Sequence, residues 1–212
     1  LVAVESSYNF ELDILIGIDH PKEMLLKNTI KFANGYHANN VLLWGARGTG
    51  KSSLLKAVHG QLLSEGLDCA IVEVQREDIQ DLPHIMQVLK HSNRRFILFC
   101  DDLAFEEADT SYKSLKAVLE GGLSGRPDNI VFYATSNRRH LMPRQMIDNE
   151  RGSAINPSEA IEEKISLSDR FGLWIGFHSV DQDTYLSMIE SYVVFYELPV
   201  DLEQTKSLAL TW

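Results

Sequence analysis

Two stretches of the sequence carry residue types and spacing suited to phosphate chemistry. The first, GARGTGKS, fits the pattern G-x-x-x-x-G-K-[ST], in which glycines let backbone N–H groups surround phosphate oxygens. In such a loop Lys51 reaches the β- and γ-phosphates, and the Ser52 hydroxyl binds Mg²⁺. The predicted nucleotide-binding residues of this loop are Gly45, Ala46, Arg47, Gly48, Thr49, Gly50, Lys51, Ser52 and Ser53.

The second stretch, FILFCDD, places Asp101 and Asp102 directly after an apolar run. Ligands of open parallel sheets bind at the carboxyl ends of the strands, so these acids belong at the predicted phosphate site. We expect Asp101 to hold Mg²⁺, largely through water, and Asp102 to orient or deprotonate the attacking water. An isolated pair of aspartates would instead indicate a turn or a helix cap.

A third polar group follows another apolar run, in YATSN. Asn137 lies at the tip of that predicted strand, where its amide suits a hydrogen bond to the γ-phosphate or to the attacking water. The alternative is a turn asparagine. The next residues are Arg138, Arg139 and His140, whose side chains could contact phosphates, a partner or only solvent. We favour exposure to solvent.

Strand-like and helix-like stretches alternate along the chain, which predicts a mainly parallel sheet flanked by helices. The predicted strands are 40–44, 69–74, 95–102, 129–137 and 171–177. The predicted helices are 23–35, 51–66, 77–92 with an interruption at Pro83, 110–122 and 181–198, the last capped by Asp181 or Asp183. The polar segment 146–164 breaks this alternation and predicts a mobile loop that leads into a short helix near Ser158.

Composition excludes several classes of protein. A net charge of −10 argues against a protein that coats nucleic acid, although a local basic patch is compatible with it. The sequence has no apolar run of the ~18–20 residues that span a bilayer, and its start lacks the pattern of a signal peptide. The two cysteines, Cys69 and Cys100, lie in apolar runs and favour buried, reduced thiols. We therefore expect a cytoplasmic protein without membrane contact.

The order of these motifs, followed by SLSDRFG, resembles the AAA+ ATPases, a class of P-loop NTPases. Within them the chain is similar to the DUF815 family of uncharacterised bacterial ATP-binding proteins. The resemblance rests on LIGID, ANNVLLWGARGTGKSSL, RFILFCDDLAFEE, YKSLKAVLEGGL, PDNIVFYATSNRRHLMP and EEKISLSDRFGLWI, which extend from about Leu12 to Tyr185.

The resemblance implies further site residues. The segment LIGID would fold over the adenine, with Ile16 and Gly17 as base contacts, and Asn137 would be the polar sensor. Arg170 would be the arginine finger that enters the neighbouring subunit's site.

For Arg170, the alternative is a local ion pair with Asp169 or Glu163.

The resemblance also implies two domains, and the sequence differs from the AAA+ pattern at two points. Residues 1–180 would form the AAA+ core, with an N-terminal helix at about 20–35, and 181–212 the start of a small helical lid that we expect to be truncated. Asp102 stands where many AAA+ ATPases carry glutamate, and its shorter side chain suits slow hydrolysis. The last thirty residues contain no arginine for the sensor that such a lid usually carries.

We predict a five-stranded AAA+ ATPase that uses ATP/ADP and Mg²⁺, assembles as a homo-oligomer when ATP is bound, and remodels or loads an unknown protein or nucleic-acid client. The predicted catalytic residues are Lys51, Asp102, Asn137 and Arg170, and the predicted metal-binding residues are Ser52 and Asp101. The alternative is a nucleotide-gated scaffold with little turnover. A small-molecule P-loop kinase is disfavoured by SDRFG and by the sensor-like Asn137.

Overall fold

A five-stranded parallel sheet forms the centre of the protein in the computed structural model, which describes residues 11–105, 111–121, 125–139, 141, 167 and 169–211. The strands are β1 Val41–Gly45, β2 Cys69–Glu73, β3 Arg95–Cys100, β4 Ile130–Ser136 and β5 Leu173–Phe177. Their order across the sheet is β2-β3-β4-β1-β5, and every paired neighbour is parallel. The predicted number and direction of strands are therefore confirmed.

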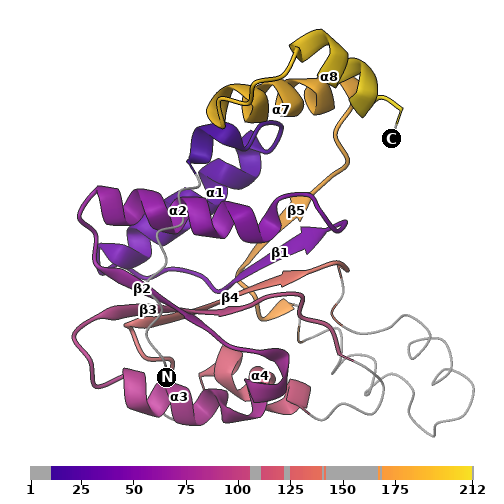
Figure 1. Ribbon diagram of the computed structural model, residues 1–212. Coiled ribbons are helices and arrows are strands. Elements are labelled where there is room, and N and C mark those ends of the chain that lie inside the picture. The colour runs from indigo at the N-terminus through magenta and orange to yellow at the C-terminus, as the bar shows by residue number, and fades with distance from the viewer. Residues whose placement is uncertain are drawn as a thin grey trace, which may run out of the picture.

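Helices cover both faces of the sheet (Figure 1). Helices α1 Asp19–Ala33 and α2 Lys51–Ser64 cover one face, and α3 Leu82–Leu89 and α4 Ser111–Glu120 cover the other. Along β1 the side chains alternate: Val41 and Leu43 pack with α1 and α2, whereas Leu42 packs with α3 and α4. A strand buried on both faces reads as a continuous apolar run, as VLLW does.

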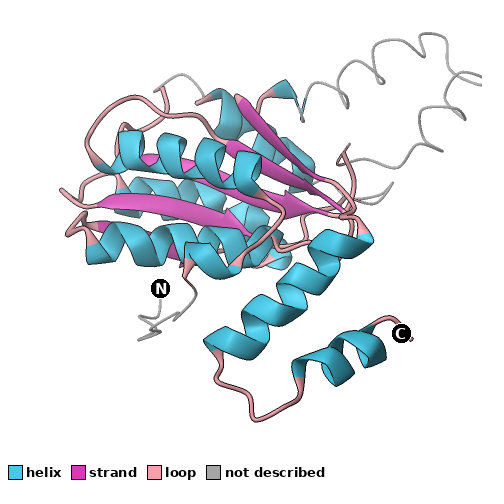
Figure 2. Cartoon of the chain, turned by 90° about the horizontal axis from the view of Figure 1, so that it is seen from above, coloured by secondary structure: helices cyan, strands magenta, loops and turns pink. Residues whose placement is uncertain are grey.

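Two C-terminal helices, α7 Gln182–Phe195 and α8 Leu202–Ala209, stand off this layered core (Figure 2). Neither helix has a fully buried residue. The Asp181 carboxylate accepts a hydrogen bond from the Thr184 backbone N–H at 2.8 Å, so Asp181 rather than Asp183 caps α7. Within the described ranges no helix is long and apolar enough to cross a membrane.

Several predicted boundaries were wrong by a few residues. Helix α1 begins at Asp19 rather than 23, because Pro21 fits the first turn of a helix, where its missing N–H costs nothing. For the same reason Pro83 lies in the first turn of α3 instead of interrupting a helix; the preceding turn is a 3₁₀ helix, η2 Arg76–Asp81. The predicted loop 146–164 and the helix near Ser158 lie outside the described residues.

Cys69 and Cys100 are both buried and both free, as predicted. Cys69 pairs with Arg95 at the start of β3, whereas Cys100 is the last residue of β3. The two thiols therefore lie near opposite ends of the strands. Burial raises the pKa of each thiol to about 12, which keeps both protonated and unreactive at neutral pH.

A buried polar cluster anchors the middle of β4 to α1. The Tyr133 hydroxyl accepts a hydrogen bond from Asn28 Nδ2 at 2.9 Å and lies 3.1 Å from the Thr29 hydroxyl. The Asn28 side chain in turn bonds the backbone of Asn39, which leads into β1. Because Tyr133 is fully buried, these bonds tie β4 to α1 and to the chain that enters β1.

Candidate nucleotide-binding site

The predicted site residues meet where three neighbouring strands end. The loop 46–50 follows β1, Asp101 and Asp102 follow β3, and Asn137 follows β4. The sheet places β4 between β3 and β1, with Cys100 beside Ala134 and Trp44 beside Ser136. Parallel pairing therefore brings the acids, the amide and the loop to one edge of the sheet, as expected for a ligand site.

Lys51 is the most buried charged group of this edge, with 7 % of its surface exposed. Its ammonium donates to the carbonyl oxygens of Gly45 at 2.9 Å and Ala46 at 2.7 Å, and to Asn137 Oδ1 at 3.2 Å. Burial lowers the pKa of Lys51 from its ordinary value, while the negative charges of Asp101 and Asp102 raise it. The loop thus closes around its own lysine.

The two aspartates are joined through Thr135 of β4. Asp101 Oδ1 accepts hydrogen bonds from the hydroxyls of Ser52 at 2.6 Å and Thr135 at 2.5 Å. The Thr135 hydroxyl also accepts a bond from the backbone N–H of Asp102 at 2.8 Å. Ser52 and Asp101, the two predicted metal ligands, are therefore in direct contact.

Asn137 connects the second aspartate to the lysine. Its amide nitrogen donates to Asp102 Oδ1 at 2.6 Å, and its amide oxygen accepts from the Lys51 ammonium. The hydrogen bonds run from Lys51 through Asn137, Asp102, Thr135 and Asp101 to Ser52, and the peptide bond between Lys51 and Ser52 closes this series into a ring. Five predicted site residues, Lys51, Ser52, Asp101, Asp102 and Asn137, belong to this ring, which we name the polar ring.

The loop has the backbone that close approach requires. Gly45 has φ +149°, and a Cβ there would lie 2.3 Å from the carbonyl oxygen of Phe177 in β5. Gly48 has φ +79° with nothing near a Cβ, and Gly50 caps α2 in the left-handed region. The Thr49 hydroxyl donates to the Ala46 carbonyl at 2.8 Å, which tightens the turn.

Exposure differs along the loop. Ala46, Arg47 and Gly48 are exposed, and Ser53 in the first turn of α2 is half-buried.

The segment predicted to contact adenine lies between the loop and α7. A Cβ built on Gly50 would lie 3.8 Å from Ile18 Cδ1, which places this segment beside the phosphate loop. A Cβ built on Gly17 would come within 2.6 Å of Thr184 Cγ2. Ile16 is half-buried and Gly17 exposed. The role of Ile16 and Gly17 at a base remains a prediction.

Arg170 is not part of the polar ring. Its guanidinium forms an ion pair with Glu120 at the end of α4, with Nε donating to Oε1 at 2.6 Å. The alternative to the arginine finger was a local ion pair with Asp169 or Glu163, whereas the observed partner is Glu120; Glu163 lies outside the described residues. Arg170 precedes β5, whose first residue pairs with the first residue of β1, so one strand length, ~13 Å, separates it from the loop of its own chain.

The basic segment after Asn137 turns toward an aromatic side chain. The Arg139 guanidinium lies over the Trp44 ring, 5.4 Å from its centroid, and His178 meets the same ring edge-on at 5.7 Å. Arg138 and Arg139 are exposed, which agrees with the solvent interpretation; His140 lies outside the described residues.

Three residues near the site were missed by the sequence analysis: Thr135, Glu120 and Thr184. Thr135 lies inside the quoted motif YATSN, so its position at a strand end was the available signal. No sequence feature marked Glu120 or Thr184, because both meet their partners only through the fold.

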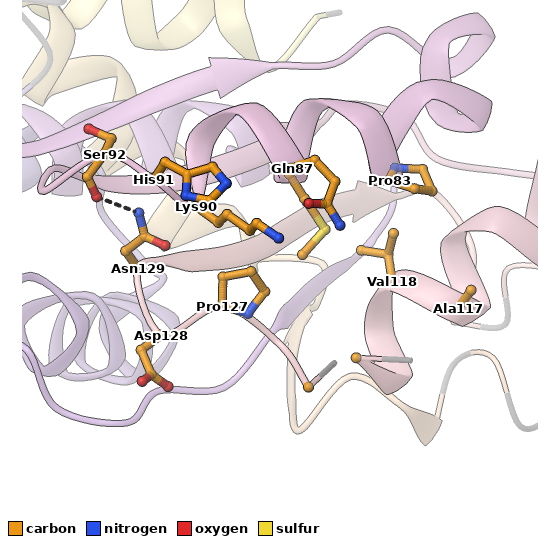
Figure 3. A pocket seen from close by; sticks show the side chains of 13 residues that line it. Pro83, Gln87, Lys90, His91, Ser92, Ala117, Val118, Pro127, Asp128 and Asn129 are labelled. Carbon is orange, nitrogen blue, oxygen red and sulfur yellow. Dashed lines mark hydrogen bonds between the residues drawn. The ribbon is translucent and has the colours of Figure 1, made fainter. Parts of the chain in front are cut away.

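The described residues also line an open pocket of about 630 Å³ away from the polar ring (Figure 3). It lies between α3, α4 and the turn before β4, so it opens at the opposite edge of the sheet. Residues 122–124, adjacent in the chain to its lining residues Gly121 and Gly125, lie outside the described residues, and we assign no site there.

The chain matches one protein family and is similar in fold to several solved structures. The model of a family described as "Protein of unknown function (DUF815)" matches residues 1–212, and a search of curated proteins gave no match. Similar solved structures include the RuvB Holliday junction branch migration motor of Thermotoga maritima, with a TM-score of 0.57 and 16% identity over 93% of this chain and 57% of that chain.

Two further structures share the fold. AMPPCP-bound DnaA from Aquifex aeolicus has a TM-score of 0.58 and 15% identity over 95% of this chain and 60% of that chain. The Aeropyrum pernix ORC1 protein in complex with DNA has a TM-score of 0.61 and 12% identity over 89% and 52%. The chain spans little more than half the length of these proteins, and the likeness shows a P-loop fold of AAA+ type.

The loop geometry predicts a sharp difference between two glycines. Gly45→Ala would drive a Cβ into the immobile carbonyl of Phe177 and should reduce the free energy of unfolding by about 3 kcal/mol or more. Gly48→Ala meets open space and should cost only the left-handed backbone, about 1–2 kcal/mol. Urea denaturation of both variants measures the difference, and equal losses would contradict the described loop.

Proposed function

The chain belongs to the DUF815 family, and we propose that it is an AAA+ protein that binds ATP with Mg²⁺ and hydrolyses it to drive a change in a macromolecular partner. The polar ring is the observation that carries the proposal. It gathers a buried cation, two hydroxyls, two carboxylates and an amide next to a glycine loop, and these include the groups that phosphoryl transfer needs.

The residues present fit a triphosphate. The exposed part of the loop offers backbone N–H groups at the N-terminus of the fourteen-residue helix α2, where anions are stabilised. The Lys51 ammonium now donates to two loop carbonyls and Asn137, and phosphate oxygens would compete for the same donor. Adenine would lie against Ile16 and Gly17, beside the start of α7.

The residues also fit Mg²⁺ when it arrives with the nucleotide. Among the described residues no group of three or more His, Cys, Asp or Glu could hold a metal ion alone. Ser52 and Asp101 together suit Mg²⁺, which is usually held by one or two protein ligands plus substrate phosphates. Mg²⁺ bound there would neutralise charge on the β- and γ-phosphates.

Asp102 is the proposed base that orients or deprotonates water, and Asn137 is the proposed sensor of the γ-phosphate. In the polar ring Asn137 instead donates to Asp102. A nucleotide that draws the Asn137 amide away would release the Asp102 carboxylate, so γ-phosphate binding and base activation would be coupled.

The same contact favours the second candidate function. If the Asn137–Asp102 hydrogen bond persists with ATP bound, the base stays occupied and the protein acts as a nucleotide-gated scaffold with little turnover.

We further propose that residues 1–180 act as the AAA+ core and that α7 and α8 begin a small helical lid, with ATP-bound subunits assembling into a homo-oligomer. Arg170 supports the assembly because it lies one strand length from the loop of its own chain. It would leave Glu120 to reach the nucleotide of a neighbouring subunit, where arginine fingers neutralise transition-state charge. The client, a protein or a nucleic acid, is not specified by the site.

Lys51→Ala tests nucleotide binding. Removing a charge-assisted donor to the β- and γ-phosphates should weaken ATP affinity at least about tenfold in isothermal titration calorimetry. The wild-type protein should bind with a dissociation constant in the range of about 1 µM to 1 mM. Lys56→Ala, a change of the same type on α2, is the matched control and should bind normally. Unchanged affinity in a folded Lys51→Ala protein would overturn the assignment of the loop.

Arg170 tests assembly. Arg170→Ala should nearly silence phosphate release, since arginine fingers contribute ~10³–10⁵ in rate. A mixture of Arg170→Ala and Lys51→Ala proteins should recover part of the activity, because one variant keeps the loop and the other keeps the finger. Activity of the wild-type protein should rise steeply with its concentration.

Glu120→Gln is the matched control for Arg170. It removes the ion pair but keeps the finger, so turnover should be retained. If Arg170 serves only to hold Glu120, both variants will lose similar stability and both will keep wild-type turnover at every concentration, which would contradict the role in assembly.

A further inference from the structure

One buried hydroxyl holds both acids of the polar ring. The Thr135 side chain is 1 % exposed and lies in β4, two residues before Asn137. It donates its proton to Asp101 Oδ1 at 2.5 Å and accepts the Asp102 N–H at 2.8 Å. A hydroxyl has one proton and two lone pairs, so a single orientation of Thr135 satisfies both bonds.

The turn that carries the acids depends on the same residue. Asp102 has φ +50°, a left-handed conformation that costs a residue with a side chain about 1–2 kcal/mol. Thr135 accepts hydrogen bonds from the backbone N–H groups on both sides of the Asp102 Cα: its hydroxyl accepts from Asp102, and its carbonyl accepts from Leu103 at 2.7 Å. Thr135 therefore fixes the position of this strained turn.

We propose that Thr135 is a positioning residue that sets the Asp101 carboxylate for the metal and fixes the backbone from which Asp102 acts. Its hydroxyl and that of Ser52 both donate to Asp101 Oδ1, so the carboxylate is oriented from two sides. Groups that bond and orient a metal ligand typically change metal affinity 10–100-fold when they are removed. The inference rests on the proposed function, because Thr135 acts only through the two acids.

Thr135→Val tests the hydroxyl, because valine keeps the branched shape and loses both bonds. The measurement is the affinity for a non-hydrolysable ATP analogue, titrated at a series of Mg²⁺ concentrations. Thr135→Val should raise the Mg²⁺ concentration for half-maximal binding by about 10–100-fold and leave binding without Mg²⁺ unchanged. Thr135→Ser keeps the hydroxyl and should restore the wild-type Mg²⁺ dependence.

Thr29→Val is the matched control for a merely structural loss. Thr29 of α1 is fully buried, and its hydroxyl donates to the Leu25 carbonyl at 2.7 Å. It also contacts Tyr133, which lies in β4 like Thr135 but away from the acids. Its variant should lose stability in urea denaturation while its Mg²⁺ dependence stays normal. If Thr135→Val does not fold, Thr135→Cys replaces it, because a thiol is a weak donor and should still raise the Mg²⁺ requirement.

The outcomes separate the two proposals. A wild-type protein without Mg²⁺-dependent binding would overturn the proposed function and this inference together. Normal wild-type binding with an unchanged Mg²⁺ dependence in the folded Thr135 variant would overturn the positioning role alone. A Thr135→Ser protein as defective as Thr135→Val would likewise overturn it, because the hydroxyl would then be irrelevant.

Discussion

The Lys51 ammonium is a charge with little access to water, and the arrangement of the sheet edge follows from the need to satisfy it. Burial of an unpaired cation would be costly, so the surrounding groups must offer oxygen atoms. The loop supplies two carbonyls and Asn137 supplies a third oxygen, while the two aspartates contribute negative charge. Phosphate oxygens could replace those oxygens as acceptors. The hydrogen bonds that satisfy Lys51 in this structure can therefore be exchanged for bonds to a nucleotide.

The polar ring requires the carboxyl ends of three strands to lie side by side at one edge of the sheet, and parallel pairing provides this. β4 lies between β3 and β1, so the residues that follow these strands become neighbours although they are far apart in the chain. In the middle of β4, Tyr133 bonds Asn28 of α1, whose side chain bonds the backbone before β1. The same strand thus carries the anchor to α1 and the groups that orient the acids.

Much of the fold could be predicted because the strands are buried on both faces and read as apolar runs, with a glycine loop that has a known spacing. The residues at the strand ends were also accessible, since strand direction alone places Asp101, Asp102 and Asn137 at one edge. Thr135 was not singled out, because a threonine in a strand usually signals β-propensity rather than a contact with two acids. The Arg170–Glu120 pair joins residues fifty positions apart, and local patterns carry no information about such a contact. The start of α3 was misjudged because Pro83 was interpreted as an interruption of a helix rather than as a first-turn residue.

We expect a bound nucleotide to take the place of the oxygens that now surround Lys51. A crystal structure of the protein with Mg²⁺ and a non-hydrolysable ATP analogue would show whether it does. The triphosphate should lie in the loop between Gly45 and Lys51, with the Lys51 ammonium moved from the Gly45 and Ala46 carbonyls to phosphate oxygens and Mg²⁺ beside Ser52. An analogue bound elsewhere, or a Lys51 side chain that keeps its present carbonyl contacts with the analogue bound, would contradict it.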